Sequence, residues 1–165
     1  MVDRQLSEHL QPSLLDRLTD HSPDSKTEGR KDRVIDVRAL VDIVQRDLTW
    51  LLNTNNFETQ FDAERYPNIQ SSVLNYGVRE VAGEMSTRER AISIRKMIHN
   101  TIRRFEPRIR ATTLSVDFED EGDAQSTLIS YSIRAEMWAQ PIPLDLYLRS
   151  QVNVTTGELK LERKG

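Results

Sequence analysis

The feature that most constrains this chain is a change of hydrophobic period around residues 103–110. Before it, apolar residues recur every three or four positions, at Ala91, Ile94, Ile98, Ile102 and Phe105. After it they recur every second position, at Leu114, Val116 and Phe118. The first spacing lines one face of a helix and the second one face of a strand. Proline has a fixed φ and disfavours helix in the residue before it, so Glu106 and Pro107 should form a stiff joint between the two.

The residues upstream of this joint predict two long helices. Asp36 is a favourable N-cap for a helix ending near Asn53. Its apolar stripe is predicted to be Val37, Leu40, Val41, Val44, Leu48, Leu51 and Leu52. The second helix should open at a capping box, Ser86-Thr87-Arg88-Glu89, and bury Met97 beside its own apolar stripe.

Between the two helices the chain is polar with aromatic interruptions. We expect residues 55–66 to form an ordered loop held by the rings of Phe57, Phe61 and Tyr66. A short helix should begin at Pro67 and end before Gly77, which suits the left-handed conformation that follows many helices. Val73, Leu74 and Tyr76 would pack this helix down.

Downstream of the joint, alternation predicts a small antiparallel sheet. The second expected strand has its apolar residues at the odd positions from Ile129 to Met137. The third spans about 144–154, and a last short strand is Leu159-Lys160-Leu161. The predicted fold is therefore α+β: N-terminal helices packed on one face of a C-terminal antiparallel meander of three to four strands.

The first part of the chain differs in composition. Residues 19–32 contain no apolar side chain, which predicts a flexible linker, so we divide the chain into an arm, 1–32, and one folded domain, 33–165. Within the arm, residues 13–18 can form one helical turn capped by Ser13. So short a helix needs something to pack against, and it is either part of a disordered tail or a segment that docks on a partner.

Composition excludes several classes of function. Hydrophobic residues make up 37% of the chain and charged residues 30%, with a formal net charge of −3, so no global basic field indicates nucleic acid. The chain has no cysteine, which excludes disulfides and thiolate metal sites. It has neither a signal-peptide pattern nor an apolar run long enough to span a membrane, and we expect a soluble, cytoplasmic protein without membrane insertion.

No catalytic, cofactor or metal motif is present. The three histidines are widely separated, and the six glycines form neither a phosphate-binding loop nor a dinucleotide fingerprint. The acidic run Asp117–Asp123 superficially follows a calcium loop, but its twelfth position is Leu128 instead of glutamate. We expect no cofactor, no metal, no catalytic residue and no small-molecule substrate.

Glu106 and Arg108 should project together from the joint, because side chains two apart on an extended segment point the same way. Two interpretations remain open at this point: an internal clasp fastening the helix to the sheet, or a contact for a partner. A glycosidase would need one protonated carboxyl group. A neighbouring cation favours the ionised carboxylate instead.

Four segments in order resemble one family. They are Ser13-Leu14-Leu15-Asp16-Arg17-Leu18, the stretch from Arg46 to Thr54, Ser72-Val73-Leu74-Asn75-Tyr76-Gly77, and Glu106-Pro107-Arg108. Together they resemble the baseplate wedge proteins of contractile phage tails, described as lysozyme-like, and among them the type VI secretion branch, TssE.

The resemblance implies a non-enzymatic baseplate component, with peptidoglycan cleavage through Glu106 as the alternative. Its partners would be other wedge subunits and contractile sheath subunits, at the inner face of the cytoplasmic membrane. Wedge docking would use Glu106, Pro107 and Arg108, with a second docking segment at Leu14, Leu15, Arg17 and Leu18. Sheath assembly would start by strand exchange at a sheet edge, either 143–154 or 158–161.

Overall fold

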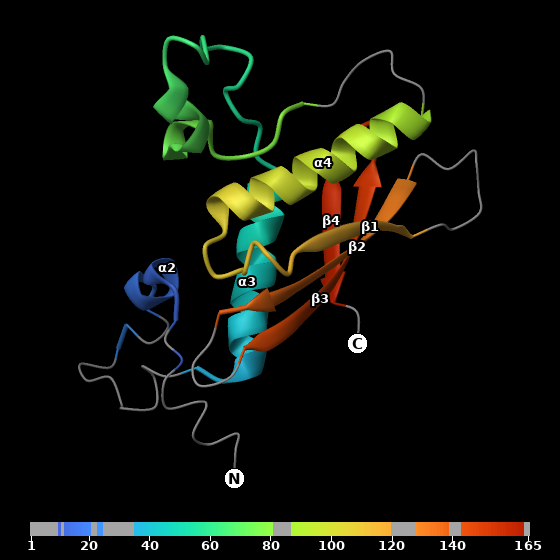
Figure 1. The fold of residues 1–165 in the computed structure, drawn as a ribbon. Helices are drawn as coiled ribbons and strands as arrows, with labels where there is room; N and C mark the ends of the chain where they lie inside the picture. Colours follow the sequence, from blue (N-terminus) through green and yellow to red (C-terminus); the bar gives the residue numbers. More distant parts are fainter. Residues whose placement is uncertain are drawn as a thin grey trace.

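In the computed structural model, two long helices cover one face of an antiparallel sheet (Figure 1). The structure describes residues 10, 12–20, 23–24, 35–80, 87–119, 128–138 and 143–163. Within these ranges the sheet has four strands in the order β1-β2-β3-β4, so each strand pairs with the next along the chain. The predicted α+β fold, helices first and meander last, is confirmed.

The first long helix, α3 (Val37–Leu52), begins where its cap predicts. The Asp36 carboxylate accepts the Ala39 N–H at 2.7 Å, which satisfies one of the free amides of the first turn. The predicted stripe is buried from Leu40 to Leu52, and Val37 is half-buried at its end.

The second long helix, α4 (Thr87–Phe105), lies across the sheet. Its predicted apolar residues enter the core, with Ile98 and Ile102 fully buried. The Tyr131 hydroxyl of β2 donates to the Ala91 carbonyl at 3.0 Å and ties the helix to the sheet. Ser86 lies outside the described residues, so the predicted capping box is not seen.

The strands are β1 (Ser115–Glu119), β2 (Leu128–Met137), β3 (Leu144–Asn153) and β4 (Leu159–Arg163). The predicted alternation of apolar residues places one face of the sheet in the core. Ile133 pairs with Val116 on one side and Leu148 on the other, and all three are buried. Because β3 is paired with β2 and with β4 across 148–152, the expectation that 143–154 could be a sheet edge is wrong there.

Residues 55–76, which we call the lobe, lie beside the C-terminal end of α4 and away from the sheet (Figure 1). Instead of one short helix they contain two 3₁₀ turns, η1 (Pro67–Ser71) and η2 (Val73–Asn75). The prediction that aromatic rings hold this loop in place is wrong for Phe57 and Tyr66, whose side chains are about half exposed. Asn75 holds the lobe instead: it is fully buried, accepts the Phe57 N–H and donates to the Gln70 carbonyl.

The start of the chain returns to the domain at two points. Leu10 is buried in the core, and its carbonyl accepts the Ile35 N–H at 3.2 Å. Farther on, α2 (Leu14–Leu18) lies near the flank of α3 (Figure 1). Most of the predicted linker, 19–32, lies outside the described residues.

Candidate functional site

Glu106 and Arg108 pair directly across Pro107. Arg108 Nε lies 2.7 Å from Glu106 Oε1, and Nη2 lies 2.5 Å from Oε2, a two-pronged contact of guanidinium and carboxylate. The Arg108 N–H also donates to Glu106 Oε1 at 3.1 Å. Glu106 is 5% exposed, so its charge is removed from water and matched internally. The expectation that the two side chains project together is confirmed.

The pair is fastened to helix α3 as well. Arg108 Nη2 donates to Asp47 Oδ2 at 2.8 Å, so a residue in the middle of α3 completes the corner. Hydrogen bonds to Glu106, and then to Asp47, raise the pKa of Arg108 above its usual value. Arg108 is therefore cationic at neutral pH.

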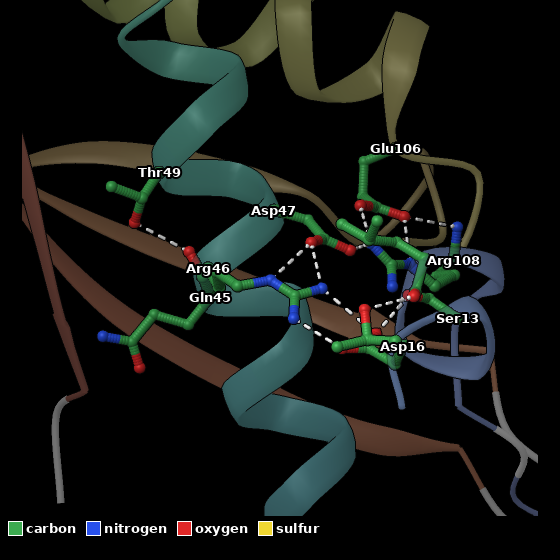
Figure 2. A network of polar contacts seen from close by, with 10 residues as sticks. Ser13, Asp16, Gln45, Arg46, Asp47, Thr49, Glu106 and Arg108 are labelled. Carbon is green, nitrogen blue, oxygen red and sulfur yellow. Dashed lines mark hydrogen bonds and ion pairs between the residues drawn. The ribbon is translucent and has the colours of Figure 1, made fainter. Parts of the chain in front are cut away.

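The charged contacts continue from α3 to α2 (Figure 2). Asp47 Oδ1 accepts from Arg46 Nη2 at 2.7 Å, and Arg46 Nη1 lies 2.5 Å from Asp16 Oδ1. The Arg46 hydrogen bond is the main reason why the pKa of Asp16 falls to about 2. Ser13 stands at the N-cap position of α2, but its hydroxyl donates to Asp16 instead of capping a backbone amide.

Six side chains thus form one polar network on three segments: Ser13, Asp16, Arg46, Asp47, Glu106 and Arg108. We call it the corner network. Charges alternate from Asp16 to Glu106, so Arg46, Asp47 and Arg108 each contact an opposite charge on both sides. It orients α2 and the α4–β1 connection relative to α3.

Backbone contacts hold the corner against the end of β2. The Trp138 N–H donates to the Arg108 carbonyl at 2.6 Å, and the Arg110 N–H donates to the Glu136 carbonyl at 2.9 Å. Pro107, the residue before these two anchors, is exposed. The corner is therefore a rigid feature that presents Pro107 and part of the Arg108 side chain to solvent.

Tyr76 borders the same network from the lobe. Its ring meets that of Phe105 edge to face, with centroids 5.6 Å apart. Burial raises the pKa of Tyr76 first, and the nearby charges of Asp47 and Glu106 raise it further. All four segments that resemble the wedge family therefore meet at this corner.

Of the predicted docking residues, the structure brings the corner and α2 together but leaves the leucines outside. Leu14 is 71% exposed and Leu18 75%, with Leu15 about half exposed. The contacts made by Asp16, Arg46 and Asp47 were missed, because no local pattern marks a charge on a helix face as paired. One feature of the sequence could have indicated these residues, since each lies in a segment that resembles the wedge family.

The geometry of Glu106 does not suit a glycosidase. Both carboxylate oxygens accept from Arg108, and the group is almost fully buried, so neither oxygen faces a substrate. The described residues also contain no cluster of three or more side chains suited to holding a metal ion.

An α+β domain with a charged corner and exposed leucines on a tethered helix has the features of a protein that assembles with others. The family model of baseplate wedge protein gp25 matches residues 38–142, more than half of the chain. The protein belongs to this family, whose members are structural components of the baseplate.

The chain has no significant match to a curated protein or to a solved structure. Among the described residues, no helix is both long and apolar enough to cross a membrane.

Proposed function

We propose that this protein is a non-enzymatic baseplate subunit of a type VI secretion system, similar to TssE. It docks to other wedge subunits and starts contractile sheath assembly in the cytoplasm, at the inner face of the cytoplasmic membrane. The family match supports the baseplate role, and the resemblance of the four ordered segments supports the secretion branch.

Wedge docking involves the face that α2 and the corner share. The observation that carries this proposal is the exposure of Leu14 and Leu18 on a helix whose Asp16 is tied to Arg46. A five-residue helix is not stable alone, so a tether that leaves its leucines in water favours a partner that covers them. Leu15 and Arg17 complete this docking segment, and Pro107 with the exposed part of Arg108 adds a rigid contact beside it.

The experiment is affinity capture of the tagged protein from its own host, comparing wild type with Leu14→Ser/Leu18→Ser. Both leucines are exposed, so the variant should fold normally and lose the wedge subunits. Tyr147→Ser, which removes a half-exposed ring from the other face of the sheet, is the matched control. If wild type captures no baseplate subunit, the proposal is wrong and a peptidoglycan-cleavage assay follows.

Sheath assembly by strand exchange needs an open sheet edge. The edge of β4 is covered: Asn53 donates to the Leu159 carbonyl and accepts its N–H, and Gln45 donates to the Leu161 carbonyl. Among the described residues, Val116, Asp117 and Phe118 of β1 have no such cover. We therefore propose β1 as the edge that accepts a sheath strand, in preference to 158–161.

The absence of cysteine allows a direct test with single labelled cysteines. Asp117→Cys on β1 and Glu162→Cys on β4 both replace exposed side chains and can carry the same photocrosslinker. Crosslinks from position 117 to the sheath subunit, without crosslinks from position 162, are expected. The opposite pattern would move the accepting edge to β4.

A further inference from the structure

The segment Ser72–Gly77 divides into two parts with different environments. Asn75 is fully buried and Gly77 is packed against the Thr54 carbonyl, so this half secures the lobe. Val73 is 84% exposed and Leu74 68%, which contradicts the expectation that they pack the lobe down. Neither the fold nor the proposed wedge contact accounts for these two aliphatic side chains.

Their outward direction is held by local hydrogen bonds. The Ser72 hydroxyl accepts the Leu74 N–H at 3.0 Å and caps η2, while Asn75 turns inward to bond the Gln70 carbonyl. In a 3₁₀ turn of three residues, one residue facing inward directs the other two outward. Val73 and Leu74 are therefore presented to water by a rigid turn, an arrangement typical of a contact site.

The lobe is attached to the helix end that leads into the corner. Arg104 Nη1 donates to the Gln70 carbonyl at 2.9 Å, and Tyr76 contacts Phe105, the residue before Glu106. In Figure 1 the lobe, the C-terminal end of α4 and α2 follow one another along one side of the molecule. The lobe that carries the aliphatic pair thus lies on the same side of the molecule as the elements proposed for wedge docking.

The charge of the lobe indicates what kind of partner fits it. It carries three carboxylates, Glu58, Asp62 and Glu64, against the single guanidinium of Arg65. Two small side chains cover far less than the roughly 800 Å² per partner of a stable interface, so they do not by themselves hold a second copy of this chain. They suit the edge of a larger contact.

We propose that Val73 and Leu74 insert into an apolar pocket, rimmed by basic side chains, on the wedge subunit that docks at α2 and the corner. This inference rests on the proposed function and adds the lobe as a second anchoring point. Apolar anchors supply affinity, and the excess of carboxylates in the sequence of the lobe favours a basic rim and fast association.

The test measures binding of the full chain to the purified wedge complex of the same baseplate, assembled without this subunit. Val73→Ser/Leu74→Ser should raise the dissociation constant about tenfold or more. The dissociation constant of Tyr147→Ser should stay within about twofold of the wild-type value. Glu58→Lys/Glu64→Lys should mainly slow association and reduce its dependence on salt. Thermal unfolding of each variant checks that the fold is retained.

The outcomes separate this inference from the proposed function. Normal binding by Val73→Ser/Leu74→Ser, together with weak binding by Leu14→Ser/Leu18→Ser, overturns the lobe contact and leaves wedge docking intact. If the wild-type protein does not bind the wedge complex, both fall. Self-association in sedimentation experiments that only Val73→Ser/Leu74→Ser abolishes would assign the pair to a second copy, and would also overturn the inference.

Discussion

Arg108 and Asp47 are 61 positions apart in the chain, and Arg108 Nη2 lies 2.8 Å from Asp47 Oδ2. This contact joins the Glu-Pro-Arg corner to the middle of helix α3. The Glu106 and Arg108 side chains are therefore clasped internally, but to helix α3 instead of to the sheet, which was the clasp considered from the sequence. A clasp and a docking site are compatible, since a rigid corner costs a partner little entropy on binding.

Arg108→Ala should destabilise the domain by about 3 kcal/mol, because it leaves the buried Glu106 carboxylate without its partner. Urea denaturation measures this difference. Arg110→Ala is the matched control: its ion pair with Glu136 is 3.4 Å long and exposed, so its loss should cost about 0.5 kcal/mol or less. Equal effects of the two variants would show that the corner pair contributes no more than a surface pair.

Acid should weaken the attachment of α2 as the pH falls from about 3.8 toward 2. The pKa of Asp16 is about 2 in the folded protein against 3.8 for the free side chain, so its ion pair contributes fully above pH 3.8 and is lost as pH falls toward 2. The pair is partly exposed and screened, so the contribution is about 1 kcal/mol. Carbon-13 titration of the Asp16 carboxyl group measures it, and in Arg46→Ala the pKa should return toward 3.8.

Gly77→Ala should disrupt the base of the lobe. The residue has φ +119°, and an added Cβ would lie 2.1 Å from the Thr54 carbonyl oxygen, so the backbone must shift. A loss of about 3 kcal/mol or more is expected in thermal unfolding. Gly157→Ala provides the comparison: its φ is also positive, at +75°, but a Cβ there meets no atom within 4 Å, and about 1 kcal/mol is expected.

Asn53→Ala should expose the edge of β4. The Asn53 side chain satisfies both backbone groups of Leu159, and its loss should cost about 1–3 kcal/mol. An uncovered edge also favours pairing between chains, so sedimentation should detect association at high concentration. Thr54→Ala, which removes only an exposed hydroxyl bonded within its own helix end, should remain monomeric.

The elements themselves were predictable from local sequence. The stripe of α3, the cap at Asp36 and the alternation in the strands each follow from spacing within about ten residues. The lobe was less predictable, because its 3₁₀ turns have no apolar period. A single buried amide, Asn75, orients them, and nothing in the local pattern marks that amide as buried.

By itself, the sequence determined that helices precede a meander and that Glu106 and Arg108 project together from a proline joint. Periodicity and the fixed φ of proline are properties of neighbouring residues, which is why these features can be read without coordinates. Only the tertiary structure decided that Arg108 reaches Asp47, that Asn53 covers β4 and that Val73 remains in water. These contacts depend on how helices pack on a sheet, which brings together residues that no local pattern connects.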